Sequence, residues 1–598
     1  MNVLLLLLFA GLIYFLAQRY YAPFLGRLWG ENDKNVTPSL QKNDGVDYVP
    51  TKPHILFAHH FSAIAAAGPI LGPTMALLYG YLPAFLWIVF GAVLIGAVHD
   101  YACLFVSVRE EGHSIAQVAR KTLGRPAFIL YALFIVFNLV VVNANFINLT
   151  AVSLTSARET SALGLDENQT IFRTVVDPQT GKNLAAVGGI ASSSAIILTL
   201  IAPFLGYWLI KKNLREIFAY PLATVLCVFS VWIGFIYPVV SHGIDWGWIH
   251  ITPTNVWVIL IALYVWIAAA VPVWMILQPR EFVSVQFLYL GILLLIVAVI
   301  SVALQGQPIQ APALDLPQGE KSFGFLWPSL FVTIACGAIS GFHGLVGTGT
   351  TSKQIMKESH CKFIGYSAMS GESILALCVT LAIAVGVSYS DYTALLIRPE
   401  NAPAGWAANP VLAFALGVSG ICQAGLGIPK WLGLVFGLLM VEGFVLDTLD
   451  VSIRLNRYLL EEIWATCFKT VPQFLKNFWV NSGISVALML LLAYGNSAQN
   501  LWPIFGTGNQ LLASLSLLAV SVWMIAHKRN FYPVLIPAIF VGITTIASLI
   551  YLLGWRYYPQ GKYLLAATDV IFLCLAAGVM VYALKAARKK PILEAIQP

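Results

Sequence analysis

Apolar segments about 20 residues long recur from one end of this chain to the other, and a helix needs that length to cross the hydrocarbon core of a bilayer. Only 10% of the 598 residues are charged, compared with about 25% in soluble globular proteins. A soluble multidomain enzyme is therefore excluded. The sequence predicts an all-α polytopic membrane protein.

The apolar segments number about fifteen when each crossing takes about 20 residues. We expect spans at residues 1–18, 54–80, 82–107, 127–153, 188–210, 217–240, 255–278, 283–305, 326–347, 366–389, 430–450, 477–494, 503–526, 533–554 and 563–586. Basic residues cluster in alternate loops, which predicts an external N-terminus and a cytoplasmic C-terminus. The net charge of +7 thus indicates orientation rather than a nucleic-acid-binding surface.

Three regions follow from this arrangement. Residues 1–53 hold the first span and a cytoplasmic loop, residues 54–450 form the core and include the external loop 154–187, and residues 451–598 hold a cytoplasmic linker helix and the last spans. No region is large enough for a separate soluble domain, which disfavours an ATP-driven pump. The eight cysteines include no C-x-x-C pair, so we expect packing residues rather than disulfides or metal ligands.

The span at 54–80 contains two Gly-Pro pairs, Gly68-Pro69 and Gly72-Pro73. Proline has no backbone N–H, so Pro69 cannot donate to the carbonyl of Ala65, and Pro73 cannot donate to that of Pro69. Inside a bilayer, such carbonyls need other protein or a water-lined cavity to supply the missing hydrogen bonds. The segment therefore predicts a broken helix that lines a transport site.

Two adjacent histidines precede these Gly-Pro pairs. A single buried histidine is more often a packing residue, but a pair beside two helix breaks favours a function for at least one of them. The candidate substrate-binding residues of this segment are His59, His60, Ser62, Gly68 and Pro69.

A further proline break lies at Pro272, which frees the carbonyl of Ala268 in a span of the opposite direction. A simple kink would explain it, but the break follows the first one by five spans. An inverted five-plus-five repeat of the LeuT type requires that relation. Pro272 and Trp274 are therefore also candidates for substrate binding.

The glycine-rich segment 333–353 would place Thr333, Gly337, Ser340 and Gly344 on one helical face, with His343 beside them. Close helix packing alone could explain its glycines. The hydroxyls near its end suit a cation or a substrate carboxylate, and they belong to Thr348, Thr350, Thr351 and Ser352. A phosphate-binding loop is excluded because residue 350 is threonine where the motif needs lysine.

Polar and ionisable residues inside spans are costly and usually face a cavity or a partner. Asp100 and Glu372 lie near span ends, where water could also reach them, and Asn143 belongs to an unusually polar fourth span. Asp450 and Arg454 are four residues apart on one helix. A salt bridge between them and a role in gating are both open.

Several short motifs combine these polar residues with glycine and proline. They are Asn43-Asp-Gly-Val-Asp-Tyr-Val-Pro-Thr51, the His59-His60 stretch with its Gly-Pro pairs, Gly96-Ala-Val-His-Asp100, Pro272-Val-Trp with Pro279-Arg280, residues 333–351, and Leu501-Trp-Pro-Ile-Phe-Gly506 with Asn509-Gln510. In order and over most of the chain, they resemble the CstA carbon-starvation family. The resemblance implies a bacterial inner-membrane transporter for peptides or pyruvate, used when preferred carbon is scarce. It also implies a core of ten helices in two inverted halves, like that of the amino acid–polyamine–cation superfamily.

The resulting hypothesis is ion-coupled uptake of a small carboxylate-bearing nutrient by alternating access. Amide groups of the unwound segment would face the carboxylate, and candidate wall contacts are Ser62, Asn143, Trp274 and Ser340. A proton is the favoured coupling ion and could bind His59, His60 or His343, because histidine titrates near physiological pH. A sodium ion would instead use carbonyls near Ala65 with hydroxyls. The residues considered for ion coupling are Ala65, Asp100, Ser340, Thr348, Thr350 and Thr351.

Two other classes of protein stay open. A metal held by His59, His60, Asp100 or His343 would indicate an intramembrane enzyme, although adjacent histidines point about 100° apart on a regular helix. The other class is a nutrient sensor without flux. We expect no organic cofactor, and the sequence does not fix the oligomeric state.

Overall fold

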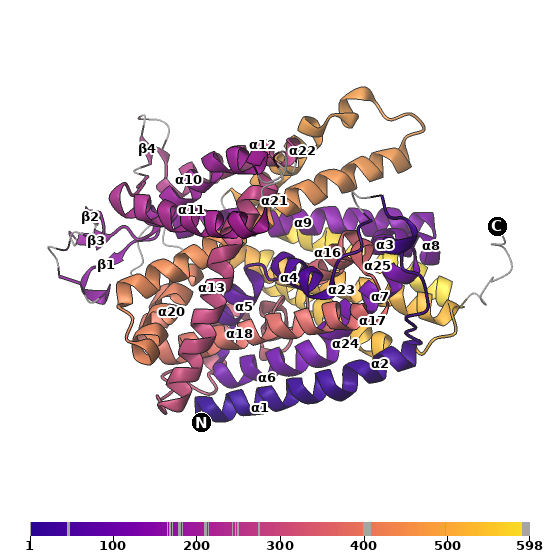
Figure 1. Cartoon of the computed structure of the whole chain (residues 1–598), viewed down its shortest axis with the longest axis horizontal. Coiled ribbons are helices and arrows are strands. Elements are labelled where there is room, and N and C mark those ends of the chain that lie inside the picture. The colour runs from indigo at the N-terminus through magenta and orange to yellow at the C-terminus, as the bar shows by residue number, and fades with distance from the viewer. Residues whose placement is uncertain are drawn as a thin grey trace. The chain divides into compact units, whose positions relative to one another are not determined.

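The computed structural model describes residues 2–588, except for residues 45–47, 164, 167–168, 170, 177–180, 182, 209–211, 213–214, 242, 246, 248–249, 273–274, 399–407, 495 and 497. Its regular structure is almost entirely helical (Figure 1). The chain forms two compact units. The first unit comprises residues 1–4, 139–312 and 378–501, and the second comprises residues 5–138, 313–377 and 502–598.

The second unit contains helices from three parts of the chain. They are α1 (Val3–Leu16, from Leu5 on), α2 (Ala22–Trp29), α3 (Pro38–Gln41), α4 (Pro53–Ile64), α5 (Gly68–Ala76), α6 (Tyr81–Gly91), α7 (Ala97–Arg109), α8 (Ile115–Leu123), α14 (Leu316–Phe323), α15 (Leu326–Thr333), α16 (Gly341–Gly349), α17 (Ser359–Cys361), α24 (Tyr532–Tyr551) and α25 (Tyr563–Arg588). Besides α1, whose Val3 and Leu4 belong to the first unit, three helices have residues in both units, namely α9 (Arg125–Leu154), α18 (Ser367–Gly386) and α23 (Ala498–Ala526).

The first unit contains the remaining helices and all the described strands. Its helices are α10 (Gly188–Gly206), α11 (Glu216–Ile236), α12 (Pro253–Ala270), α13 (Leu277–Leu304), α19 (Tyr389–Leu396), α20 (Pro410–Leu426), α21 (Lys430–Cys467) and α22 (Phe478–Ala493). Its strands are β1 (Arg158–Glu159), β2 (Thr174–Val176), β3 (Asn183–Ala185), β4 (Ile244–Asp245) and β5 (His250–Ile251). They form two antiparallel sheets, one with the strand order β1-β3-β2 and one that pairs β4 with β5. The three-stranded sheet lies in the loop 154–187, which is expected outside the membrane.

Twelve continuous helical segments of the described residues are long and apolar enough to cross a membrane, or thirteen if α4 and α5 are counted as one bent span. Some of these segments join two of the named helices, as Tyr81–Arg109 joins α6 and α7. The expected number of about fifteen is not confirmed. Two expected spans account for the difference. The segment 326–347 is divided between α15 and α16, and α22 has only 16 residues.

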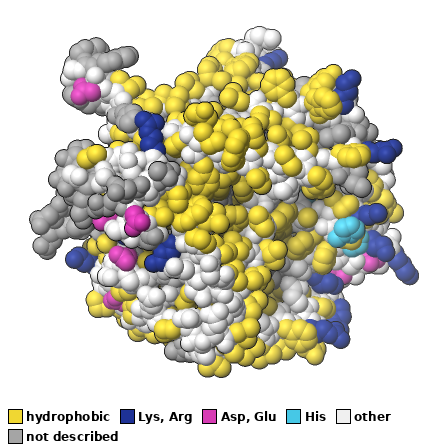
Figure 2. Space-filling view, turned by 60° about the vertical axis from the view of Figure 1, so that its left-hand side comes forward, with side chains coloured by type: hydrophobic (Ala, Val, Ile, Leu, Met, Phe, Trp, Pro, Cys, Tyr) yellow, Lys and Arg dark blue, Asp and Glu magenta, His cyan; other side chains and the backbone are white. Residues whose placement is uncertain are grey.

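Large apolar side chains are exposed along the outer helices. On α1, Leu5, Leu8 and Leu12 are each more than half exposed and recur at helical spacing. Figure 2 shows one face of the molecule, on which hydrophobic side chains predominate and charged ones are few. A water-exposed surface of this kind would be an aggregation hazard, whereas lipid covers it at no cost.

Candidate functional site

The predicted break in the 54–80 span is present in the second unit. α4 ends at Ile64 and α5 begins at Gly68, and the two helices are bent by 49°. Pro69 lies in the first turn of α5, where its missing N–H costs no helical hydrogen bond. The expectation of a second break at Pro73 is wrong, because α5 continues through that residue. The break therefore lies at residues 65–67, directly before the first Gly-Pro pair.

A second broken segment lies between α15 and α16. Residues 334–340 are not helical, and Ser340 has the extended backbone angles φ −138° and ψ 126°. The prediction that Thr333, Gly337 and Ser340 share one helical face is therefore wrong. Ser340 instead precedes the first turn of α16, which carries His343.

The two broken segments pack against each other, and glycine makes this close approach possible. A Cβ atom at Gly68 would lie 2.3 Å from the Cys336 sulfur, and one at Gly72 would lie 2.9 Å from the carbonyl oxygen of Thr333. No other residue type fits there without movement of the neighbouring segment. From the sequence, close packing was only an alternative explanation for the glycines of residues 333–353, and the second broken segment was not predicted.

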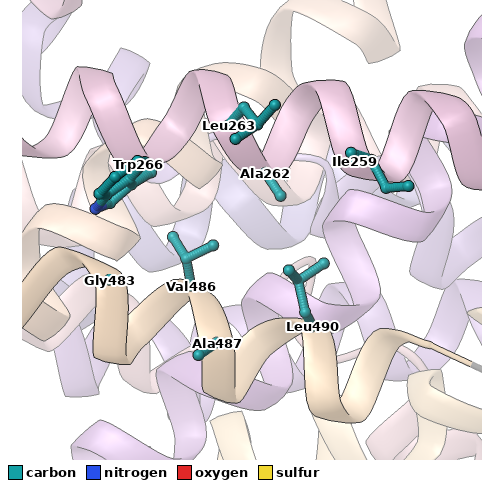
Figure 3. A pocket seen from close by; sticks show the side chains of 8 residues that line it. All are labelled: Ile259, Ala262, Leu263, Trp266, Gly483, Val486, Ala487 and Leu490. Carbon is teal, nitrogen blue, oxygen red and sulfur yellow. The ribbon is translucent and has the colours of Figure 1, made fainter.

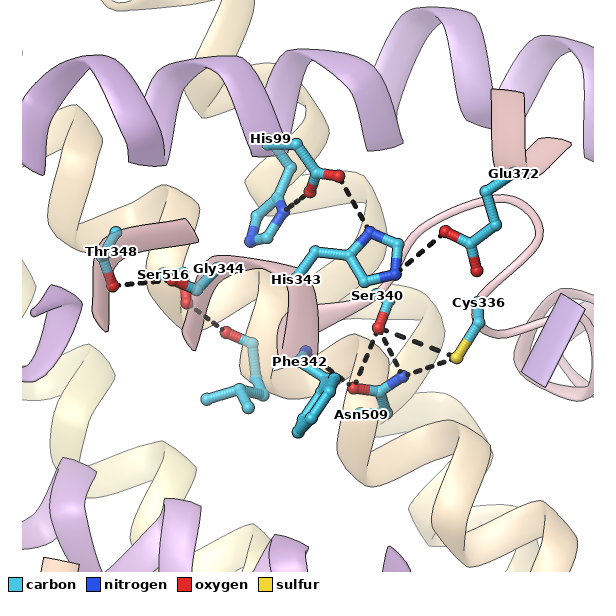
Figure 4. Close-up of polar contacts among 12 residues, drawn as sticks. His99, Cys336, Ser340, Phe342, His343, Gly344, Thr348, Glu372, Asn509 and Ser516 are labelled. Atoms are coloured by element: carbon cyan, nitrogen blue, oxygen red, sulfur yellow. Dashed lines mark hydrogen bonds and ion pairs between the residues drawn. The ribbon is translucent and has the colours of Figure 1, made fainter. Parts of the chain in front are cut away.

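Side chains of α23 supply hydrogen bonds that the second broken segment cannot make internally. Asn509 accepts from the Phe342 N–H at 3.0 Å and donates to the Ser340 hydroxyl at 3.0 Å (Figure 4). Gln510 and Trp502 donate to the carbonyl oxygens of Phe331 and Thr333, at 2.7 and 3.0 Å. This explains two polar residues of the Leu501–Gln510 motif, because the hydrogen bonds of an irregular backbone at membrane depth must be supplied by neighbouring protein.

A chain of buried ionisable side chains, which we call the His343 relay, passes beside these breaks. It consists of His99 and Asp100 on α7, His343 on α16 and Glu372 on α18. His99 Nδ1 lies 2.7 Å from Asp100 Oδ1, and His343 Nδ1 lies 2.8 Å from Asp100 Oδ2. On its other side, His343 Nε2 lies 3.0 Å from Glu372 Oε2 (Figure 4). All four side chains are buried.

The His343 relay can hold one additional proton. His343 Nδ1 is hydrogen-bonded to Asp100, whereas His343 Nε2 and the two carboxyl oxygens of Glu372 are buried without a hydrogen-bond partner among the described residues. An ionised carboxylate can only accept hydrogen bonds, and each ring nitrogen of His343 faces a carboxyl oxygen. Both ring nitrogens would be hydrogen-bonded at once either with His343 protonated on both nitrogens or with a proton on one of the carboxyl groups. Both arrangements hold one proton more than a neutral ring between two carboxylates. Such a group suits reversible proton binding.

The adjacent histidines of α4 have different surroundings. His60 is 1% exposed, and its Nδ1 lies 2.9 Å from the Thr351 hydroxyl, whereas His59 is exposed. This agrees with the expected divergence of neighbouring side chains on a helix. In the described part of the chain, the Nε2 atoms of His60 and His99 are buried without a hydrogen-bond partner. His60 is therefore better placed than His59 to bind a buried solute.

The predicted hydroxyl ligands are mostly engaged in local hydrogen bonds. Thr348 donates to the carbonyl of Gly344 at 2.6 Å and accepts from the Ile115 N–H at 2.9 Å. Thr350 donates to the carbonyl of Val346 at 3.0 Å. Ser62 is half-buried on α4, and Ala65 is buried where that helix ends. No group of three or more His, Cys, Asp or Glu side chains among the described residues converges in a way that would hold a metal ion.

The proline break at residue 272 lies in the first unit, between α12 and α13. Arg454 on α21 donates to the carbonyl oxygens of Ala268 and Val271, at 2.5 and 2.7 Å. The Ala268 carbonyl is the one that the proline was expected to free. Arg454 thus caps the end of α12, and its hydrogen bonds are to these carbonyls rather than to Asp450.

Asp450 belongs to a second buried group, which we call the Arg280 cluster. Arg280 Nη1 lies 2.9 Å from Asp450 Oδ2 and 3.2 Å from Asp447 Oδ1. Arg280 also lies 3.6 Å from Glu442, and the Tyr264 hydroxyl lies 2.5 Å from Asp450. The cluster consists of Tyr264, Arg280, Ser284, Glu442, Asp447 and Asp450.

Several of these residues had no role predicted from the sequence. Glu372 was noted there as an ionisable residue near a span end and Arg280 as part of a motif, and neither had a predicted partner. Asn509 is part of one of the short motifs, but the sequence did not indicate what it does. Nothing in the sequence around Tyr264 indicated a function. Asn143 is buried in the first unit and accepts a hydrogen bond from Ser452. Pro272 is exposed, and Trp274 lies outside the described residues.

A cavity of about 300 Å³ lies between α12 and α22 in the first unit. Its lining contains only apolar side chains and a glycine, as Figure 3 shows, and comprises Ile259, Ala262, Leu263, Trp266, Gly483, Val486, Ala487 and Leu490. The indole N–H of Trp266 donates to the Trp479 carbonyl at 3.0 Å. The cavity offers no charged or hydroxyl group to a carboxylate.

Comparison with known families decides the assignment. The model of the family described as carbon starvation protein CstA matches residues 2–402 and 400–548. The chain belongs to this family. It is a multi-pass membrane protein, as the composition predicted, and the resemblance noted from the sequence motifs is confirmed.

Relatives within the CstA family cover most of the chain. The peptide transporter CstA of Bacillus subtilis is 29% identical over 91% of this chain and 89% of its own length. The pyruvate/proton symporter BtsT of Escherichia coli is 30% identical over 90% of this chain and 80% of its own length. A solved manganese transporter of Eremococcus coleocola covers 91% of this chain and 98% of its own, at 11% identity and a TM-score of 0.45.

Proposed function

We propose that this CstA family member is a secondary transporter that imports peptides or pyruvate, with protons as the coupling ion. The observation that carries the proposal is the His343 relay, in which one imidazole bridges two buried carboxyl groups. The relatives named as peptide transporters and as a pyruvate/proton symporter support both the substrate class and the ion.

Proton binding at His343 would change the charge next to the two broken segments. Both substrate classes carry a carboxylate, and the N-terminus of α5 begins at the first break, where a helix dipole favours an anion. His60, Gly68 and Pro69 are the residues of that break that we assign to the substrate. The buried Nε2 of His60, which has no hydrogen-bond partner in the described part of the chain, is a further donor or acceptor for the solute.

The charges of the loops support an orientation of the chain in the membrane, and the family supports the kind of membrane. We assign the chain to a bacterial inner membrane, with the N-terminus outside and the C-terminus in the cytoplasm. The inverted five-plus-five arrangement, and the gating role of Asp450 and Arg454, belong to this proposal. Sodium coupling is the alternative, with carbonyls near Ala65 as ligands.

The decisive experiment uses purified protein in liposomes, with labelled pyruvate and a labelled dipeptide as probes. We expect a pH gradient to drive accumulation in the wild type. His343→Gln should reduce that accumulation at least about tenfold, because glutamine cannot carry the coupling proton, while counterflow exchange without a gradient continues. The exposed His527→Gln is the matched control and should behave as the wild type.

Undiminished pH-driven accumulation by His343→Gln would contradict the assignment of the relay. Accumulation driven by a sodium gradient at equal pH would support the alternative ion. Counterflow of neither probe by the wild type would reject this substrate class.

A further inference from the structure

The Arg280 cluster holds more negative than positive charge. Its one guanidinium faces the carboxyl groups of Glu442, Asp447 and Asp450. Glu281, the next residue on α13, also lies within electrostatic range of Asp447 and Asp450, and Arg454 lies within range of Asp450. Even with Arg454 included, two arginines face four carboxyl groups. The helices α10, α20 and α22 contain no charged residue, and among the described side chains of α11 the thiol of Cys227 lies within electrostatic range of Glu442.

Burial makes this excess charge costly. Arg280, Glu442 and Asp450 are each less than 5% exposed. An ionised carboxylate away from water is tolerated only when a counter-charge and hydrogen bonds compensate it. Asp447 is 21% exposed and can be solvated, but one guanidinium cannot compensate both buried carboxylates, Glu442 and Asp450. Additional positive charge would therefore stabilise the cluster.

Two carboxyl oxygens mark where that charge can bind. Asp450 Oδ1 and Glu442 Oε1 are buried and make no hydrogen bond with any described residue, although Glu442 Oε1 lies 3.6 Å from Arg280 Nη2. The other oxygen of Asp450, by contrast, receives both Arg280 and the Tyr264 hydroxyl. A hard metal cation gathers about six oxygen ligands. A proton needs only one oxygen, and either of these two can supply it.

We propose that the Arg280 cluster is a proton-binding site separate from the His343 relay. The proton forms an O–H bond with a carboxylate oxygen of Asp450 or Glu442, and no other bond changes. This proposal adds a second proton site to the proposed function. The transport experiment described below rests on that function.

Protonation of this site would act on the break at residue 272. Asp450 binds Tyr264, on α12 before the break, and Arg280, on α13 after it. From the next turn of α21, Arg454 holds the carbonyls at the end of α12. A neutral Asp450 attracts Arg280 less strongly, so proton uptake loosens the hold of α21 on the start of α13.

The test is infrared spectroscopy of the full-length protein in lipid nanodiscs while the pH is stepped in potassium buffer. We expect a carbonyl band of a protonated carboxyl group that changes with pH in the wild type. Asp450→Asn or Glu442→Gln should remove that change. Glu461→Gln is the matched control, because Glu461 lies on the same helix outside the cluster and pairs with Arg457 at 3.9 Å.

Each carboxyl variant leaves Arg280 with two carboxyl partners, so we expect both variants to fold. Size-exclusion chromatography checks this expectation. If both variants misfold, Tyr264→Phe keeps every charge and should still move the pH at which the band changes. A pH-dependent band that persists unchanged in all folded variants would overturn the proposal. The same spectral change produced by sodium chloride at constant pH would also overturn it, in favour of a sodium site.

Transport supplies an independent readout. With pyruvate as the probe, the number of protons carried per substrate should fall by one in Asp450→Asn relative to the wild type, and an unchanged ratio would count against coupling by this site. If the wild type carries no pyruvate, the proposed function fails, and the infrared result still decides whether the cluster binds a proton.

Discussion

At the scale of single residues, the second unit depends on positions where only one side chain fits. Gly68 lets α5 contact the broken segment at Cys336, and Asn509 satisfies the backbone at Phe342. His343 has a carboxyl group on each side, with its Nδ1 hydrogen-bonded to Asp100 and its Nε2 3.0 Å from Glu372. A change at such a position either creates a steric clash or leaves a buried polar group without its partner.

Gly68→Ala should destabilise the folded protein by about 1–3 kcal/mol, because the new methyl group would overlap the Cys336 side chain. Thermal unfolding of the protein in detergent measures the effect. Gly11→Ala is the control, since a Cβ at that position meets nothing within 4 Å. The additional change Cys336→Gly should restore most of the lost stability, and no rescue would show that the clash is not the cause.

At the scale of elements, each interrupted segment is stabilised by a helix from elsewhere in the chain. α23 provides Trp502, Asn509 and Gln510 to the break before α16. In the first unit, α21 provides Arg454 to the break after α12. Breaks of this kind survive at membrane depth only because neighbouring protein supplies the missing hydrogen bonds.

Arg454→Met should weaken the first unit by about 2–5 kcal/mol, because two buried carbonyl oxygens lose a charged donor. Methionine keeps much of the side-chain volume, so lost packing contributes little. Limited proteolysis between α12 and α13 reports the loosening, and Arg457→Met on the same helix is the comparison. Equal resistance of the Arg454 variant and the wild type would show that these hydrogen bonds do not hold the break.

At the scale of the whole molecule, the charge distribution predicts how the chain lies in the membrane. Basic residues gather in alternate loops, and the positive-inside rule assigns those loops to the cytoplasm. Single cysteines at Gln307 and Asn530, with the exposed Cys467 and Cys574 replaced by serine, test this assignment in whole cells. An impermeant thiol reagent should label position 307 and not position 530. The opposite pattern would invert the proposed orientation.

Much of the fold followed from local sequence. Long apolar runs predicted nearly every membrane helix, because each helix satisfies its own backbone and only its length must match the bilayer. The Gly68-Pro69 pair predicted the first break for a local reason as well, since a proline cannot continue the hydrogen bonds of a preceding helix and is favoured in the first turn of a new one. Family membership followed from motifs, which are also properties of the sequence alone.

The pairing of polar side chains was decided only by the tertiary structure. Spacing on α21 suggested that Asp450 pairs with Arg454, but Asp450 meets Arg280 from α13 and Arg454 meets carbonyls at the end of α12. Likewise, Asp100, His343 and Glu372 come from three helices far apart in the sequence. Helical periodicity tells which residues share a face, but the partner of each face depends on how helices pack. The sequence by itself therefore determined the membrane spans, the family and the first break, whereas the His343 relay and the Arg280 cluster exist only through helix packing.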